Sequence, residues 1–248
     1  MAISNDATAT LGVNVHSQQR RMFAIFDVLF AAFFLMCLAP IILLAAAAIY
    51  LESGHPVFFS QIRLGRNGQP FWLYKLRKFN DRKLAIGGAL TVENDPRLTR
   101  VGWFLERTKL DELPQLWNIL KGEMSVVGPR PETPHFADCF KEYGQLFDYR
   151  PGIFGPVQAM FRNESGLHRA GRDPEEFYRT VLFPAKARID LAYYPRRTVY
   201  QDVVWIILGI LAVMGCSRVP QMDRNTVQEM ENWVRRRALN GIWPRQVL

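Results

Sequence analysis

The longest hydrophobic run in the chain lies near its N-terminus. Residues 28–51 read VLFAAFFLMCLAPIILLAAAAIYL and carry no charged side chain over twenty-four positions. This length reaches the roughly 20 residues that a helix needs to cross a bilayer. The run is longer than the apolar core of a cleaved signal peptide, and no convincing cleavage site follows before Glu52. We therefore expect this segment to stay in the protein as a membrane helix.

A proline interrupts the apolar run. Pro40 lacks a backbone donor and clashes with the preceding turn, so the pattern predicts a kink or break near Ala39 and Pro40. Lysine and arginine flank the run on both sides, so the positive-inside rule does not decide its topology. A kinked spanning helix and a re-entrant helix, which enters and leaves by one face, both fit the residues.

The polar and apolar pattern after the membrane segment predicts a mixture of helices and a small sheet. Two β-rich runs, 57–63 and 70–76, flank Asn67-Gly68, a pair that suits a tight turn and indicates a β-hairpin. Apolar residues at i, i+3, i+4 and i+7 predict a helix over 113–120, with Leu113, Leu116, Trp117 and Leu120 on one face. The apolar run 203–216 is too short to span a membrane and is interpreted as a buried or interfacial helix. The expected fold class is α+β and rich in helix.

Length and composition allow one medium-sized domain with a substantial core, because 49% of the 248 residues are hydrophobic. We expect a flexible N-terminus at 1–19, a membrane helix at 20–53, a cytosolic globular domain at 54–216 and a C-terminal helical extension at 217–248. In that extension, Val227, Met230, Trp233 and Val234 share a helical face, which fits an interfacial helix, a homodimer contact or a solvated terminal helix.

The charge balance favours anionic partners. A formal net charge of +8 suits phosphate, nucleotide, nucleic acid or an acidic membrane surface. The three cysteines and four histidines lack the spacing of a disulfide framework or a zinc site. No P-loop or strand-linked GxGxxG motif is present, and a membrane segment beside phosphate chemistry argues against nucleic acid as the partner.

The stretch TKLDELPQLWNILKGEMSVVGPRPE, residues 108–132, concentrates candidate chemistry. Asp111 and Glu112 stand at the expected helix start, where acids also serve simply to complement the helix dipole. Arg130 is fixed between two prolines, and Arg150 lies in the later YRPG turn. Adjacent carboxylates can hold Mg²⁺, and rigidly placed guanidinium groups grip phosphate. Together these residues indicate phosphoryl chemistry.

The order of these motifs resembles a known family. A proline-broken apolar segment is followed by FWLYKLRK, GGALTVENDPRLTRVG, LDELPQLWNILKGEMSVVGPRPE, YRPGIFG and KARIDLAYY. This series closely resembles the bacterial sugar transferases known as monotopic polyprenyl-phosphate phosphoglycosyl transferases, over roughly residues 20–215. The resemblance implies transfer of a sugar 1-phosphate from a UDP-sugar to a polyprenyl phosphate such as undecaprenyl phosphate, with UMP leaving. It also implies a role in starting the synthesis of surface polysaccharides or glycoconjugates.

Roles for individual residues follow from the same resemblance. Asp111 would be the nucleophile that forms a phosphosugar intermediate, and Glu112 a ligand of Mg²⁺, with Asp111 beside it. The family's basic substrate-binding positions correspond to Lys75, Arg77, Arg97, Arg130, Arg150 and Arg162, the last followed by Asn163. Family members also imply a re-entrant helix in contact with membrane lipids at the bacterial inner membrane, with the catalytic domain on the cytoplasmic face.

The chain departs from the family pattern at three places. The membrane helix has Ala39-Pro40 where Ser-Pro is usual. Glu106 stands where an arginine is common, with Arg107 one position later, so that a helical rotation of about 100° separates the two side chains. The stretch PGIFGPVQAMFRNES replaces a PGITGLWQV-like sequence and affects the expected sugar or nucleotide pocket. Two other readings compete: a transferase or hydrolase acting on another nucleotide-linked donor, and a non-enzymatic basic membrane scaffold of a polysaccharide assembly system.

Overall fold

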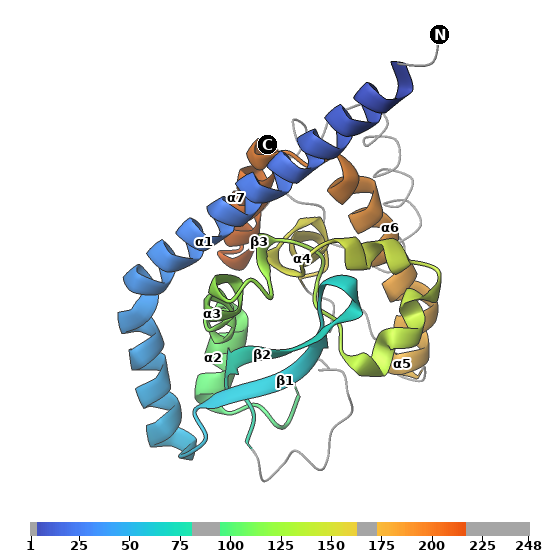
Figure 1. Cartoon of the computed structure of the whole chain (residues 1–248). Helices are drawn as coiled ribbons and strands as arrows, with labels where there is room; N and C mark the ends of the chain where they lie inside the picture. Colours follow the sequence, from blue (N-terminus) through green and yellow to red (C-terminus); the bar gives the residue numbers. More distant parts are fainter. Residues whose placement is uncertain (1–3, 81–94, 163–172, 217–248) are drawn as a thin grey trace.

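The computed structural model describes residues 4–80, 95–162 and 173–216, and describes side chains from residue 21 onward (Figure 1). The α-helices are α1 Ser4–Ser53, α2 Arg100–Thr108, α3 Gln115–Leu120, α4 Pro156–Met160, α5 Pro174–Phe177, α6 Phe183–Tyr193 and α7 Val199–Val213. The strands are β1 Phe58–Leu64, β2 Pro70–Leu76, β3 Ser125–Val127 and β4 Gly152–Phe154. Short 3-10 and π segments connect them: η1 Arg66–Gly68, η3 Leu110–Glu112, η4 Pro134–Lys141, η5 Gly144–Asp148, η7 Tyr178–Leu182 and η8 Tyr194–Arg196. The helix-rich α+β class is confirmed.

The N-terminal helix α1 is bent but continuous. It runs for 50 residues with Pro40 inside it, and Figure 1 shows it crossing the molecule diagonally before turning down toward β1. A proline inside a helix is a sufficient cause of such a bend. The membrane helix was expected to begin at residue 20, whereas α1 already begins at Ser4.

Many of the apolar side chains of α1 from residue 21 onward project away from the protein. Leu51 is 84% exposed, and Met36, Leu43 and Leu44 are also largely exposed. The segment Arg21–Ser53 is long and apolar enough to cross a membrane by length and composition. Apolar surface of this extent is unfavourable in water, so hydrocarbon is the environment that suits it. Helix α1 therefore marks the chain as membrane-associated.

Helix α1 is attached to the globular domain near the start of its apolar run. The carboxylate of Asp27 is buried and accepts hydrogen bonds from the Ser125 hydroxyl, at 2.8 and 3.0 Å, and from the Val126 amide, at 2.8 Å. Ser125 and Val126 belong to β3, a short strand in the middle of the domain. These contacts fix the first part of α1 against the domain.

The C-terminal end of α1 is attached a second time. The guanidinium of Arg77 donates to the Ser53 carbonyl and hydroxyl at 3.0 and 2.8 Å and to the Gly54 carbonyl at 2.7 Å. The carboxylate of Glu52 accepts from the first two amides of α2, those of Arg100 and Val101, at 2.8 and 3.0 Å. Backbone groups that a helix end leaves unsatisfied are thus paired across elements.

The predicted β-hairpin is confirmed. Strands β1 and β2 pair antiparallel, with Phe58 opposite Leu76 and Leu64 opposite Pro70. Asn67 and Gly68 at the turn have φ of 57° and 71°, the left-handed conformation that asparagine and glycine tolerate best. The hairpin extends as a ribbon along one side of the domain (Figure 1).

A short parallel pair, β3 with β4, brings two distant loops together. Ser125 lies opposite Gly152 and Val127 opposite Phe154. The two chain segments lie so close together that a Cβ on Gly128 would stand 2.2 Å from the Arg150 carbonyl oxygen. A Cβ on Gly152 would stand 2.0 Å from the amide nitrogen of Gly128. Glycine is therefore required at both positions, and the GPRP loop is held to the YRPG turn.

The helix predicted over 113–120 is shorter than expected, and the prediction of its buried face is partly wrong. Helix α3 begins at Gln115, and Trp117 is 52% exposed, whereas Asn118 is fully buried. The amide of Asn118 donates to the Trp72 carbonyl at 2.6 Å and accepts from the Tyr74 amide at 3.1 Å. Pairing with strand β2 therefore overrides the hydrophobic periodicity.

Helices α4, α6 and α7 pack around the main core. Trp205 of α7 and Tyr193 of α6 are fully buried there, together with Met124, Met160 and Leu182. The predicted apolar helix near 203–216 is α7, and one of its faces is buried as expected. Its other face leaves Ile207, Ile210 and Met214 exposed.

Gly102 provides a test of the packing between α2 and the end of the hairpin. A Cβ at this position would stand 2.0 Å from the Lys78 carbonyl oxygen, a backbone contact that cannot move aside cheaply. We expect Gly102→Ala to lower the free energy of unfolding by about 2–3 kcal/mol or to prevent folding. Gly144→Ala is the matched control, because a Cβ there meets no atom within 4 Å. Thermal unfolding of the two variants in detergent measures the difference, and equal midpoints would contradict this packing.

Candidate functional site

A sharp reversal of the chain creates the local structure around the two carboxylates. Helix α2 ends at Thr108, and Lys109 adopts φ 59° and ψ 15°, a left-handed conformation that is uncommon for a residue with a side chain. The turn η3 follows at once, so Asp111 and Glu112 occupy a 3-10 turn ahead of α3 rather than the first turn of that helix. Asp111 becomes 2% exposed as a result.

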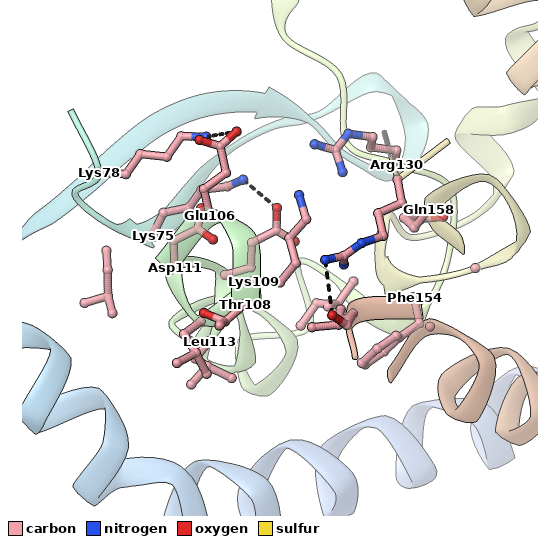
Figure 2. A pocket seen from close by; sticks show the side chains of 18 of the residues that line it. Lys75, Lys78, Glu106, Thr108, Lys109, Asp111, Leu113, Arg130, Phe154 and Gln158 are labelled. Carbon is pink, nitrogen blue, oxygen red and sulfur yellow. Dashed lines mark hydrogen bonds and ion pairs between the residues drawn. The ribbon is translucent and has the colours of Figure 1, made fainter. Parts of the chain in front are cut away.

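Both carboxylates line a cavity of about 730 Å³ between the domain and α1. Phe30, Phe34 and Leu38 of α1 supply an apolar wall. Figure 2 shows Lys75, Asp111 and Lys109 on one side of the cavity and Arg130 with Gln158 on the other. The cavity therefore joins acidic, basic and apolar surfaces in one space.

Glu112 is held in its ionised form. Lys75, on strand β2, donates to its Oε1 at 2.9 Å, and both side chains are largely buried. Burial alone would raise the pKa of Glu112, but the charges of Lys75, Lys109 and Arg130 outweigh it and bring that pKa well below its usual range. A carboxylate that stays charged inside a cavity is suited to binding a cation.

Asp111 has the opposite electrostatic balance. Burial raises its pKa above the usual value, the nearby Glu112 charge adds to this, and Lys75 only partly opposes it. Its Oδ1 atom is buried and accepts no hydrogen bond from the described part of the chain. Buried polar atoms without a partner are rare in folded proteins, so this oxygen is an acceptor available to a ligand.

Of the predicted basic residues, Lys75, Arg77, Arg97, Arg130 and Arg162 line the cavity. Arg130 projects from the proline-flanked loop and is exposed. Arg162 donates to the Arg107 carbonyl at 2.8 Å, and Asn163 beside it lies outside the described residues.

Three of the predicted arginines have contacts within the protein that the sequence did not indicate. Arg77 directs its guanidinium to the end of α1, and Arg97 forms a two-pronged pair with Asp95 at 2.6 and 2.8 Å. Arg150 is not part of the cavity lining and approaches Gly122 instead. Arg162 lines the cavity but also donates to two backbone carbonyls, those of Arg107 and Val213, at 2.8 and 3.3 Å. Binding of an anion by any of the predicted basic residues stays a prediction.

The structure also places Glu106 and Arg107, two residues at which the chain departs from the family pattern. Glu106 lines the cavity and pairs with Lys78 at 3.5 Å. The guanidinium of Arg107 lies 5.3 Å from the centre of the Trp103 ring, and Arg107 is not among the lining residues. Arg107 thus does not bring its charge to the place that Glu106 occupies.

Sequence reasoning missed several cavity residues, including Lys109, Glu132, Thr133, Gln158 and Lys186. Lys109 stands two residues before Asp111, and this proximity in sequence was the only signal for it. Gln158 and Lys186 come from α4 and α6, and only the tertiary fold brings them to the same cavity.

Comparison with known proteins shows the family of the chain. The family model of the bacterial sugar transferases matches residues 18–216. The uncharacterized sugar transferase EpsL of Bacillus subtilis (strain 168) is 32% identical over 205 residues, which cover 82% of this chain and 93% of that protein. The UDP-glucose:undecaprenyl-phosphate glucose-1-phosphate transferase of Caulobacter vibrioides is 43% identical over 77% of this chain and 68% of its own length.

A third relative is much longer than this chain. The transferase of the same name from Escherichia coli (strain K12) is 39% identical over 74% of this chain, but the match covers only 38% of the relative. The match to the family model contains the membrane helix, the acidic pair and the GPRP loop. The chain therefore belongs to the bacterial sugar transferase family.

Proposed function

We propose that the protein transfers a sugar 1-phosphate from a UDP-sugar to a polyprenyl phosphate such as undecaprenyl phosphate, releasing UMP. The observation that carries the proposal is the Asp111 carboxylate, which is buried with an unpaired oxygen in a cavity lined by cations and by membrane helix α1. Family membership and the names of the Caulobacter and Escherichia relatives support the reaction class. In this role the reaction starts the assembly of a surface polysaccharide or glycoconjugate.

Asp111 is suited to nucleophilic catalysis. Its ionised carboxylate would attack the β-phosphorus of the UDP-sugar, forming an aspartyl-phosphosugar while the bond to UMP breaks. An oxygen of the polyprenyl phosphate then attacks the same phosphorus and displaces Asp111 as a free carboxylate. The raised pKa of Asp111 indicates a poorly solvated charge, and such a carboxylate is a stronger base and nucleophile than one in water.

The two carboxylates also fit a magnesium site. The described residues hold no group of three or more His, Cys, Asp or Glu side chains, but Mg²⁺ is usually held by one or two carboxylates together with substrate phosphates. Glu112, charged and buried, and the adjacent Asp111 meet that requirement once a diphosphate enters. Bound there, Mg²⁺ would neutralise the diphosphate and the departing UMP.

Basic side chains on the cavity wall would orient the donor. Lys75 and Lys109 lie beside the carboxylates, and Arg130 extends from a loop whose two prolines limit its movement. A guanidinium can bind a phosphate through two parallel hydrogen bonds, which sets geometry as well as charge. These residues would hold the diphosphate in line with Asp111.

The apolar side of the cavity is suited to the lipid carrier. Phe30, Phe34 and Leu38 of α1 face the same space as the carboxylates, so an isoprenoid chain could lie along α1 while its phosphate reaches Asp111. Exposed Trp103, Phe104 and Trp117 add aromatic surface of the kind found at headgroup depth. We place the protein at the cytoplasmic face of the bacterial inner membrane, with α2, α3 and α7 as its interfacial helices.

We further propose that α1 is re-entrant. Asp27 and Ser53 are both hydrogen-bonded to the same polar domain, although about 39 Å of helix separates them. If α1 spanned the bilayer between these two residues, the charged domain would have to accompany it through hydrocarbon about 30 Å thick. A helix that bends at Pro40 and returns to the same face avoids that cost.

Release of UMP tests the proposed reaction. Protein purified in nanodiscs is incubated with undecaprenyl phosphate, Mg²⁺ and each of several UDP-sugars. We expect UMP with at least one donor, dependence on the lipid phosphate and loss of turnover when the metal is chelated. Absence of UMP with every donor, from folded protein, would refute the proposal and favour a scaffold function or another donor nucleotide.

Asp111→Asn separates catalysis from folding. We expect UMP release to fall by roughly three orders of magnitude or more, because the nucleophile is lost. The same variant should raise the thermal midpoint at neutral pH by about 2–4 °C, because the ionised and buried carboxylate destabilises the fold. This gain should shrink as the pH falls through the raised pKa of the folded state and should vanish below 3.8, where the wild-type carboxyl is protonated in both the folded and the unfolded state. Full activity in the variant would exclude the covalent mechanism.

Arg77→Gln and Arg130→Gln form a matched pair. Arg77 pairs carbonyl groups at the end of α1, so we expect its variant to lower the free energy of unfolding by about 2 kcal/mol or more. Arg130 is exposed, so its variant should keep the thermal midpoint and raise the KM for the UDP-sugar about tenfold. Thermal unfolding and steady-state kinetics of both proteins measure the difference. A raised KM with an unchanged midpoint in Arg77→Gln would assign Arg77 to substrate binding instead.

Cysteine labelling tests the topology of α1. Ser17→Cys and Phe58→Cys, each introduced into a chain without its native cysteines, place a thiol before and after the membrane helix. Because both ends of the helix are proposed to lie on the cytoplasmic face, a membrane-impermeant maleimide should label both positions in inverted vesicles and neither in intact spheroplasts. Labelling from opposite faces would show that α1 spans the membrane.

A further inference from the structure

Besides the two carboxylates, the cavity lining includes a group of residues around the Tyr178 ring. Glu132, Thr133, Phe136, Tyr178 and Lys186 form this group, and we call this part of the cavity the inner recess. Its residues come from the chain after the GPRP loop and from η4, η7 and α6. The acidic pair and Arg130 already account for the binding of phosphates, so the inner recess must serve another part of a substrate.

Thr133 has an unusual hydrogen-bonding state. It occupies the N-cap position of η4, where a threonine side chain ordinarily accepts from a helix amide, but its side chain makes no such bond. Its Oγ1 atom is buried and has no hydrogen-bond partner within the described part of the chain. A buried hydroxyl group that makes no cap bond, on a residue that lines a cavity, is a donor and acceptor for a ligand.

Gln158, which also lines the cavity, carries a second unpaired atom. Its Nε2 donates to the carbonyl oxygens of Gly128 and Gly152 at 2.8 and 3.1 Å, which fixes the orientation of the amide. Its Oε1 is buried and accepts no hydrogen bond from the described residues. The amide therefore offers one rigidly positioned acceptor.

The rest of the inner recess combines charge with aromatic rings. The Tyr178 hydroxyl donates to Glu132 Oε1 at 2.5 Å. The Lys186 ammonium lies 4.7 Å from the centre of the Tyr178 ring and 5.6 Å from that of Phe161. Glu132, Thr133 and Lys186 are all buried.

This set of groups suits a pyranose ring better than a nucleobase. The hydroxyl groups of a sugar both donate and accept, so they can bond to a carboxylate, an ammonium, a hydroxyl and an amide oxygen around one ring. The C–H faces of a sugar can pack on aromatic side chains. Uracil is planar and offers a single N–H donor, which leaves a recess with a buried carboxylate poorly matched.

The position along the chain agrees with this assignment. Thr133 follows Arg130 by three residues, so their backbones are at most about 10 Å apart. In a UDP-sugar the sugar is bonded directly to the β-phosphate that Asp111 would attack, whereas the nucleoside is one phosphate further away. A recess next to the arginine that orients the diphosphate is thus within reach of the sugar.

We infer that the inner recess binds the sugar of the donor and that the Thr133 hydroxyl helps to determine which sugar is accepted. The inference rests on the proposed function, because it assumes a UDP-sugar at Asp111. A site built to hydrogen-bond a substrate hydroxyl discriminates strongly against a sugar that leaves its buried groups unpaired. Glu132, Gln158 and Lys186 would complete the hydrogen bonds around the ring.

Donor selectivity of Thr133 variants tests the inference. UMP release is measured for wild type, Thr133→Val and Thr133→Ser with UDP-glucose, UDP-galactose and their 2-acetamido derivatives, and UMP is titrated as a product inhibitor. For Thr133→Val we expect kcat/KM for the preferred donor to fall at least tenfold relative to the others, with the inhibition constant of UMP unchanged. Thr133→Ser keeps the hydroxyl and should keep wild-type selectivity. Thr180→Val is the matched control, because Thr180 is exposed and outside the cavity lining.

Each other outcome overturns the inference in a distinct way. Weaker UMP inhibition with unchanged selectivity would place the nucleoside in the inner recess. Unchanged selectivity and unchanged UMP inhibition, in a variant with the wild-type thermal midpoint, would show that Thr133 touches neither group. Should Thr133→Val fail to fold, Glu132→Gln replaces it, with the same expected loss of selectivity. Failure of wild type to release UMP refutes the proposed function itself and is therefore separate from these results.

Discussion

The ion pair between Lys75 and Glu112 is the contact on which the arrangement of the site depends. Two adjacent carboxylates buried in a cavity repel each other and lose hydration, so at least one must be compensated by a nearby cation. Lys75 of β2 provides that cation, with its ammonium group 2.9 Å from Glu112 Oε1. The hairpin is held in place by Asn118 of α3 and by the close contact of α2 with Lys78. The secondary structure around the dyad is thus organised to hold one ammonium group at one carboxylate.

The same strand connects the chemistry to the membrane helix. Lys75 and Arg77 are two residues apart, so they project from the same face of the extended chain. Lys75 reaches Glu112, and Arg77 reaches the end of α1. The C-terminal end of α1 and the Asp111–Glu112 pair are therefore fixed relative to each other by about 7 Å of extended chain. In the proposed reaction, a carrier that stays in the bilayer would meet this site without leaving the headgroup region.

The sequence predicted the features that depend on local pattern. The hairpin follows from alternating β-rich runs around Asn67-Gly68, and the membrane helix follows from an apolar run of sufficient length. The prediction for α3 was partly wrong because Asn118, polar and central, is buried by hydrogen bonds to a strand that is distant in sequence. The positions of Arg77 and Arg150 depend in the same way on long-range contacts. Residues such as Thr133 and Gln158 carry no local signal, since their unpaired atoms become apparent only when the surrounding elements are in place.

The close backbone contact between Gly128 and Gly152 has a consequence for protein engineering. Neither position accepts a side chain, and Gln158 bonds to the carbonyl oxygens of both glycines, so the two loops behave as one rigid unit. Transplanting either loop alone from a relative would break this junction, and a chimera must exchange both segments together with α4. Libraries aimed at new sugar donors should therefore keep Gly128, Gly152 and Gln158 and vary residues of the inner recess such as Thr133.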